Sequence, residues 1–264
     1  MLAQGKYTDR PTLIYAPLTG NDFLKRLMTP IPPSAVLFVL QSGYAADLVM
    51  PMALDSVNGV NNESNRGMKT RPADPRFLRL VQLMREQQLA GAIQVRVERS
   101  KGDAESSLIV FGPSKDPEIA AKTREIRSIL ALKPDVQEIK VYYGGYSGKN
   151  DEIDMMTRSM LQIMLELAAI VHVPQSDVAE GRAAPGAVSD QTGDDQSPAA
   201  LEIVSSNKAP PEAYVAVPYK GRWFWIADTD IRSKYTFGFV MLLFSISDTG
   251  VRGSAPVVTV PASQ

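Results

Sequence analysis

The acidic pair Asp228 and Asp230 is the first candidate for chemistry in this chain of 264 residues. Two carboxylates in an Asp-x-Asp spacing can hold a divalent ion against a phosphate group. The pair also comes just before a predicted helix, where carboxylates accept hydrogen bonds from free N–H groups and meet the positive end of the helix dipole. We favour helix capping, which also explains Asp151, Glu152 and Asp154 at the start of another predicted helix.

A glycine-rich segment, GGYSGKN at 144–150, lies between a predicted strand and a predicted helix, as phosphate-binding loops do. A phosphate loop needs a first glycine five residues before its Gly-Lys pair, and Tyr143 occupies that position. It also needs Ser or Thr after the lysine to hold magnesium, and here Asn150 follows Lys149. The segment is therefore predicted to be an ordinary loop.

The chain has no cysteine and one histidine, His172. This composition excludes thiol nucleophiles, zinc–thiolate sites and any metal site or charge relay that needs two imidazoles. His172 follows an apolar helix end, where a protonated imidazole suits the helix dipole, so we assign it no ligand role. The sequence has no Gly-x-Ser-x-Gly motif, and no spacing supports catalysis by Ser, Asp or Glu. We expect no catalytic residue, no metal ligand and no cofactor.

The charges nearly cancel, with 28 Lys and Arg against 29 Asp and Glu. Such a chain has no overall electrostatic attraction to nucleic acid or to anionic lipid. The uncharged apolar stretch 235–247 is too short for a membrane-spanning helix, which needs about 20 residues. The N-terminus has no signal-peptide pattern. We therefore predict no nucleic-acid partner and no transmembrane span.

Periodicity, caps and turn residues predict an alternation of helices and strands. Helices are predicted over 19–28, 34–41, 45–57, 74–91, 117–132 and 151–171, and from Asp228 or Asp230 through Phe244. Strands are predicted over 12–18, 93–98, 106–111, 137–143, 201–205, 214–219, 222–226 and 256–261. The polar segments 58–73 and 180–199 are predicted to be a surface loop and a flexible linker.

The fold class expected from this order is α+β, with mixed or antiparallel sheets covered by helices. Segment 74–143 forms an αββαβ unit, whose helices should cover one face of a small sheet. In element content it is similar to small domains that build rings in secretion machines, which is an analogy of fold alone. We divide the chain into a helical and α+β domain at 1–179, a linker or loop at 180–199, and a C-terminal hairpin and helix at 200–264 that packs on the first part.

An aromatic run, Trp223–Phe224–Trp225, lies in the second strand of the predicted C-terminal hairpin. Alternation along a strand places the two tryptophans on one face and Phe224 on the other. One face should pack in the core and the other is free to meet a partner. The near-neutral charge argues against a platform for nucleic-acid bases. The predicted partner contact consists of Tyr219, Arg222, Trp223 and Trp225, and the contact surface is expected to continue from Trp223 along the following helix to Phe244.

Three blocks of the sequence resemble a known family. They are RPTLIYAPLTGNDFLKRLMTPIPPSAVLFVLQSGYAADLV at 11–49, DEIDMMTRSMLQIML at 151–165, and YVAVPYKGRWFWIADTDIRSKYTFGFVMLLFSIS at 214–247 followed by PVVTVP at 256–261. The blocks resemble an uncharacterised family of bacterial cell-envelope lipoproteins. The resemblance implies a periplasmic or outer-membrane-associated location and no particular activity. Family members carry an export signal, a lipid-bearing cysteine and an upstream region that this sequence lacks, so the chain taken as complete would be cytoplasmic.

Three functions follow as hypotheses. The leading one is a non-catalytic structural component of a bacterial cell envelope that acts through protein–protein contacts with other envelope proteins or with itself. The second is a carboxylate- or metal-dependent hydrolase or transferase that uses Asp228 and Asp230. The third is a lipid- or small-ligand-binding protein built around the methionine-rich helix predicted at 151–171.

Overall fold

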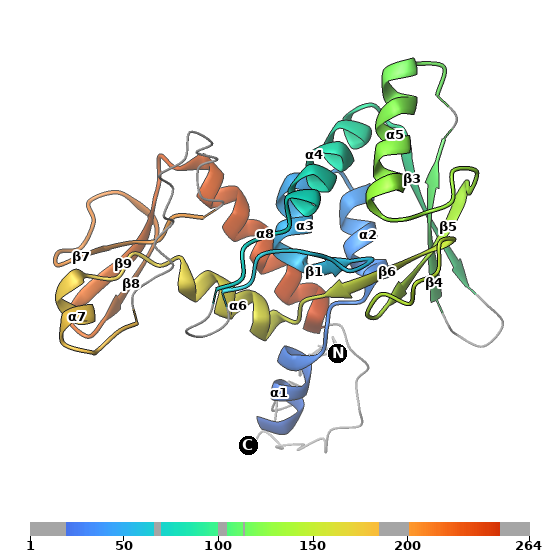
Figure 1. Cartoon of the computed structure of the whole chain (residues 1–264). Helices are drawn as coiled ribbons and strands as arrows, with labels where there is room; N and C mark the ends of the chain where they lie inside the picture. Colours follow the sequence, from blue (N-terminus) through green and yellow to red (C-terminus); the bar gives the residue numbers. More distant parts are fainter. Residues whose placement is uncertain (1–19, 66–69, 100–104, 113, 185–200, 249–264) are drawn as a thin grey trace, which may run out of the picture.

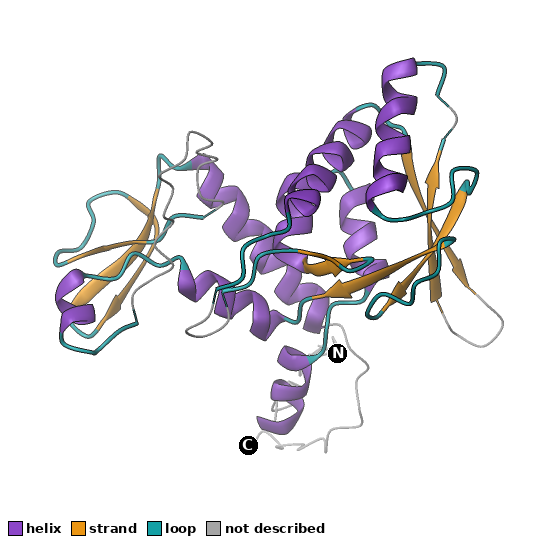
Figure 2. Ribbon diagram, in the orientation of Figure 1, coloured by secondary structure: helices purple, strands orange, loops and turns teal. Residues whose placement is uncertain are grey.

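The structure is a computed structural model that describes residues 20–65, 70–99, 105–112, 114–184 and 201–248. Within these ranges the protein is α+β, as predicted, with eight helices, a mixed six-stranded sheet and a separate three-stranded antiparallel sheet (Figures 1 and 2). The strands predicted over 12–18 and 256–261 lie outside the described residues, as does most of the linker predicted over 180–199.

The elements follow one another along the chain in a fixed order. The helices are α1 (Gly20–Met28), α2 (Pro33–Gln41), α3 (Ala46–Ala53), α4 (Pro75–Leu89), α5 (Pro117–Ile129), α6 (Met160–Ala169), α7 (Gln175–Ala179) and α8 (Ile231–Asp248). The strands are β1 (Leu54–Val57), β2 (Val60–Asn61), β3 (Ile93–Arg99), β4 (Glu105–Phe111), β5 (Glu138–Tyr143), β6 (Glu152–Thr157), β7 (Val204–Ser206), β8 (Ala213–Tyr219) and β9 (Arg222–Ala227). The large sheet has the order β2-β1-β6-β5-β4-β3.

The αββαβ unit is present as α4-β3-β4-α5-β5. Both helices begin as their sequences predict, because Asp74 accepts a hydrogen bond from the Arg76 N–H at 2.8 Å and a proline follows at the first turn. Asp116 accepts one from the Glu118 N–H at 2.8 Å in the same way. The three strands pair antiparallel in the order β3-β4-β5, and the helices bury one face of this part of the sheet.

The helix predicted over 45–57 is wrong in its second half. Helix α3 ends at Ala53, and the chain continues as β1, which turns through Asn58 and Gly59 into β2. Both turn residues have positive φ, 45° and 76°, as an Asn-Gly hairpin turn requires. The apolar run misled the prediction, because a short buried strand and a buried helix are both uniformly apolar. The Asn-Gly pair inside the predicted loop 58–73 was the missed signal.

The long helix predicted over 151–171 is also wrong. Its first part is β6, a parallel neighbour of β5, and the helix α6 begins only after Ser159. The Ser159 side chain accepts from the Gln162 N–H while the Gln162 side chain accepts from the Ser159 N–H, which forms a capping box. No methionine-rich helix therefore exists at 151–159, and Met155 is buried in the sheet.

The three-stranded sheet, with the order β7-β9-β8, lies beside the main body, and α8 joins the two (Figure 1). The register places Trp225 opposite Val204 and Ala216, and Trp223 opposite Ser206, so the two tryptophans share a face as predicted. Helix α8 continues into the main core, where Phe239 and Leu243 are buried. None of the described helices combines the length and the apolar character that a membrane span requires.

Candidate interaction surface

The carboxylates Asp228 and Asp230 both have structural partners. Asp230 Oδ1 accepts a hydrogen bond from the Ser233 N–H at 3.0 Å at the start of α8, and the Ser233 hydrogen bonds hold the pKa of Asp230 below its ordinary value. Asp228 Oδ1 lies 2.7 Å from Lys234 Nζ. Among the described residues, no group of three or more His, Cys, Asp and Glu side chains could hold a metal ion. The pair therefore acts locally in capping and pairing.

The GGYSGKN segment connects two parallel strands and does not lead into a helix. Its Ser147 N–H donates to Asp154 Oδ2 at 2.6 Å, and its Lys149 pairs with Glu152 at 3.0 Å. These contacts fold the segment back onto β6, and Tyr146 of the segment lies beside Gly59 of the β1–β2 turn. A phosphate loop needs a helix N-terminus behind it, so this arrangement has no means to hold a phosphate in that way.

His172 lies at the surface with an exposed side chain. Its backbone N–H donates to the Ile203 carbonyl at 3.0 Å, and its Nδ1 atom is 3.9 Å from a carboxylate oxygen of Glu202. These contacts help to join the segment after α6 to the segment before β7.

Arg222, a predicted partner residue, is an internal anchor of the small sheet. Its guanidinium pairs with Asp177 Oδ2 at 3.0 Å, donates to Ser176 Oγ at 2.9 Å and also donates to Asn207. The hydrogen bonds from Arg182 and Arg222 hold the pKa of Asp177 below its ordinary value. Arg222 thus fastens α7 to β9.

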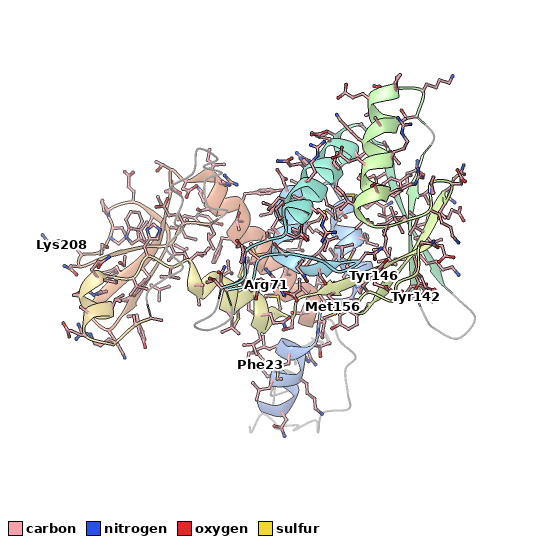
Figure 3. All side chains as sticks on the ribbon, in the orientation of Figure 1. Phe23, Arg71, Tyr142, Tyr146, Met156 and Lys208 are labelled. Atoms are coloured by element: carbon pink, nitrogen blue, oxygen red, sulfur yellow. The ribbon has the colours of Figure 1, made fainter. Side chains whose placement is uncertain are left out.

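The predicted partner residues Trp223 and Trp225 are half-buried. Trp225 Nε1 donates to Ser206 Oγ at 3.1 Å, so its polar atom is satisfied within the sheet. The most exposed large hydrophobic side chains of the hairpin are Val217 and Tyr219, at 56% and 60%. The structure thus places Tyr219 at the surface and gives both tryptophans packing contacts inside the small sheet, whose outer end lies near Lys208 in Figure 3.

Helix α8 has further exposed apolar side chains. Ile231, Tyr235 and Met241 are exposed to 78%, 51% and 51%. Tyr214 of β8 links the two parts, because its ring meets Phe237 edge-on at 6.1 Å and lies under the Lys234 ammonium. We call this set the hairpin–α8 surface. It comprises Tyr214, Val217, Tyr219, Ile231, Tyr235 and Met241.

The contact surface predicted from Trp223 to Phe244 includes most of α8, but the sequence did not identify which of its residues are exposed. The segment YTFGFVMLLFSIS has no polar face, and a helix that is apolar on all sides is normally buried all round. A helix of this composition with an open side is a candidate contact surface.

An apolar cavity lies between α2, α4 and the strands β3 and β4. Its volume is about 50 Å³, and its walls include Leu37, Leu40, Met84 and Ile109. Pockets that bind small organic ligands measure roughly 300–1,000 Å³. This cavity is a packing void in the core and is too small for a lipid.

Comparisons with known proteins assign no family. No family model matches the chain, and no curated protein and no solved structure is significantly similar to it. The fold and the surface define an α+β protein with a small aromatic sheet attached to its main body by an apolar helix. The hairpin–α8 surface is therefore the candidate functional site.

Proposed function

We propose that this protein is a non-catalytic assembly component of a bacterial cell envelope that binds other proteins through the hairpin–α8 surface. One observation carries the proposal: segment 235–247 of α8 has no charged residue, yet Tyr235 and Met241 within it and Ile231 before it are exposed by half or more. Exposed apolar groups that gather on one element mark contact sites, and aromatic residues and methionine are enriched at protein interfaces.

The alternative of a carboxylate- or metal-dependent hydrolase or transferase has less support. Its two candidate groups are engaged separately, Asp230 by the start of α8 and Asp228 by Lys234. A divalent ion would have to displace the lysine and the helix cap to bring both carboxylates together.

The cell-envelope location is supported by the resemblance of the blocks at 11–49, 151–165 and 214–247 to envelope lipoproteins.

Site-directed photo-crosslinking in the native cells tests the proposal. Benzoylphenylalanine replaces Tyr219 or Met241 in the full chain, and Leu89, which is 71% exposed at the end of α4, is the control position. We expect light-dependent adducts with a discrete protein at the two surface positions and none at Leu89. No adduct at Tyr219 and Met241, or equal adducts at Leu89, would overturn the proposal. Recovery of the chain in the cytoplasmic fraction alone would overturn its envelope location.

A further inference from the structure

One side of α8 is exposed along its whole length. At 3.6 residues per turn, Ile231, Tyr235, Gly238, Met241 and Ser245 lie on the same side of the helix, and all five are exposed. The opposite side packs against the protein through Ser233, Thr236, Phe239, Val240 and Leu243, which are all buried. The exposed residues form a narrow stripe, and Gly238 is at its centre.

No described residue of the chain explains a glycine at position 238. A glycine in the middle of a helix costs about 1 kcal/mol relative to alanine. A Cβ atom added to Gly238 would meet no atom of the described residues within 4 Å, so none of them excludes a side chain there. The absence of a side chain does allow the backbone of another helix to come close, because the distance between packed helices depends on the side chains at their contact.

The stripe is symmetric about Gly238. Tyr235 and Met241 are each three residues from it, and Ile231 and Ser245 are each seven residues from it. If a second α8 crosses in the antiparallel direction at Gly238, Tyr235 faces Met241 of the second copy and Ile231 faces its Ser245. Each contact then occurs twice, as a two-fold symmetric interface requires.

The charges also fit a second α8 in this orientation. In the N-terminal half of α8, Lys234 is the one charged residue beside the stripe. The last turn of α8 contains no basic residue. In an antiparallel pair, each Lys234 lies towards the C-terminal half of the other helix, where the helix dipole is negative. Asp228 partly balances Lys234 at 2.7 Å and stays at the edge of the contact.

From this we infer that two copies of the protein associate through antiparallel α8 helices, with both Gly238 residues at the two-fold axis. The inference rests on the proposed function and names a second copy of this chain as a partner. The experiment compares the wild-type chain with Gly238→Leu and Arg232→Leu by size exclusion with light scattering. Both changes introduce leucine at an exposed position of α8, but Arg232 lies outside the stripe.

We expect wild type and Arg232→Leu to have the mass of two copies and Gly238→Leu that of one. Circular dichroism should show unchanged folding in Gly238→Leu, because open space surrounds the new side chain and leucine favours a helix. Because the chain has no cysteine, the register can be tested with a short bismaleimide. A mixture of Tyr235→Cys and Met241→Cys should cross-link more than either variant alone.

A monomeric wild type, or a dimer that Gly238→Leu leaves intact, would overturn the inference. Neither result would affect the proposed function, since photo-crosslinking at Tyr219 also reports contacts with other proteins. The proposed function fails separately if Tyr219 and Met241 give no adducts in cells.

Discussion

Asn58 joins three segments that are distant along the chain. Its side-chain amide donates to the Leu130 backbone carbonyl at 2.8 Å and to the Glu152 backbone carbonyl at 3.4 Å. Its side-chain oxygen accepts from the Asp154 N–H at 2.7 Å. The residue is buried and has a positive φ, which asparagine tolerates better than most other residues. One side chain therefore holds the β1–β2 turn against β6 and the end of α5.

We predict that Asn58→Ala lowers the free energy of unfolding by about 3 kcal/mol or more, because buried backbone groups lose their partners and alanine is strained at positive φ. Asn61→Ala is the matched control, since Asn61 is exposed on β2 and its loss should cost less than about 0.5 kcal/mol. Urea unfolding of both variants gives the comparison. Equal midpoints would contradict the role assigned to Asn58.

At the scale of elements, the β8–β9 hairpin separates packing residues from contact residues. Trp225 lies between Val204 and Ala216 and bonds Ser206, whereas Tyr219 projects near the turn. We predict that Trp225→Ser destabilises the small sheet by about 2–3 kcal/mol, through lost burial of a large side chain and a lost hydrogen bond. Tyr219→Ser should stay within about 0.5 kcal/mol of wild type.

Thermal unfolding followed by circular dichroism measures both hairpin variants. If Tyr219→Ser unfolds the sheet as readily as Trp225→Ser does, Tyr219 is a packing residue and must be removed from the hairpin–α8 surface.

The start of α8 should respond to acid through Asp230. Because hydrogen bonds from Ser233 lower its folded-state pKa, Asp230 stabilises the fold above its ordinary pKa of 3.8, and this contribution disappears as the pH falls through the lower folded value. Asp230→Asn keeps a good helix cap that does not titrate. We predict that wild type loses stability more steeply than Asp230→Asn below about pH 4. If the free energies of unfolding of wild type and Asp230→Asn, measured with urea, fall equally as the pH is lowered, the charge of Asp230 makes no contribution to stability.

At the scale of the whole molecule, the two sheets differ in how much they bury. Ile139 and Ile153 are fully buried in the large sheet, whereas Ile226 is the one described residue of β7, β8 and β9 that is buried. We predict that the amides of β8 and β9 exchange hydrogen faster than those of β4 and β5, because local opening needs less free energy where few apolar groups are buried. Exchange followed by mass spectrometry measures this, and equal protection would show that both sheets open together.

Local signals in the sequence determined much of the architecture. The caps Asp74 and Asp116, each followed by proline, set the starts of α4 and α5, and alternation identified β3, β4 and β5. The shared face of Trp223 and Trp225 followed from strand geometry alone. These features depend on neighbours within a few residues, so a sequence pattern contains them.

Tertiary structure alone decided the features that depend on distant segments. Burial between β1 and β5 makes 152–157 a strand although its sequence also suits a helix. Likewise, Asp177, which lies 45 residues earlier, holds Arg222 away from the surface. The exposed stripe of α8 exists because the main core covers only the other side of the helix. An apolar sequence predicts that the helix is buried, but only the packing of the whole chain determines which side of the helix stays exposed.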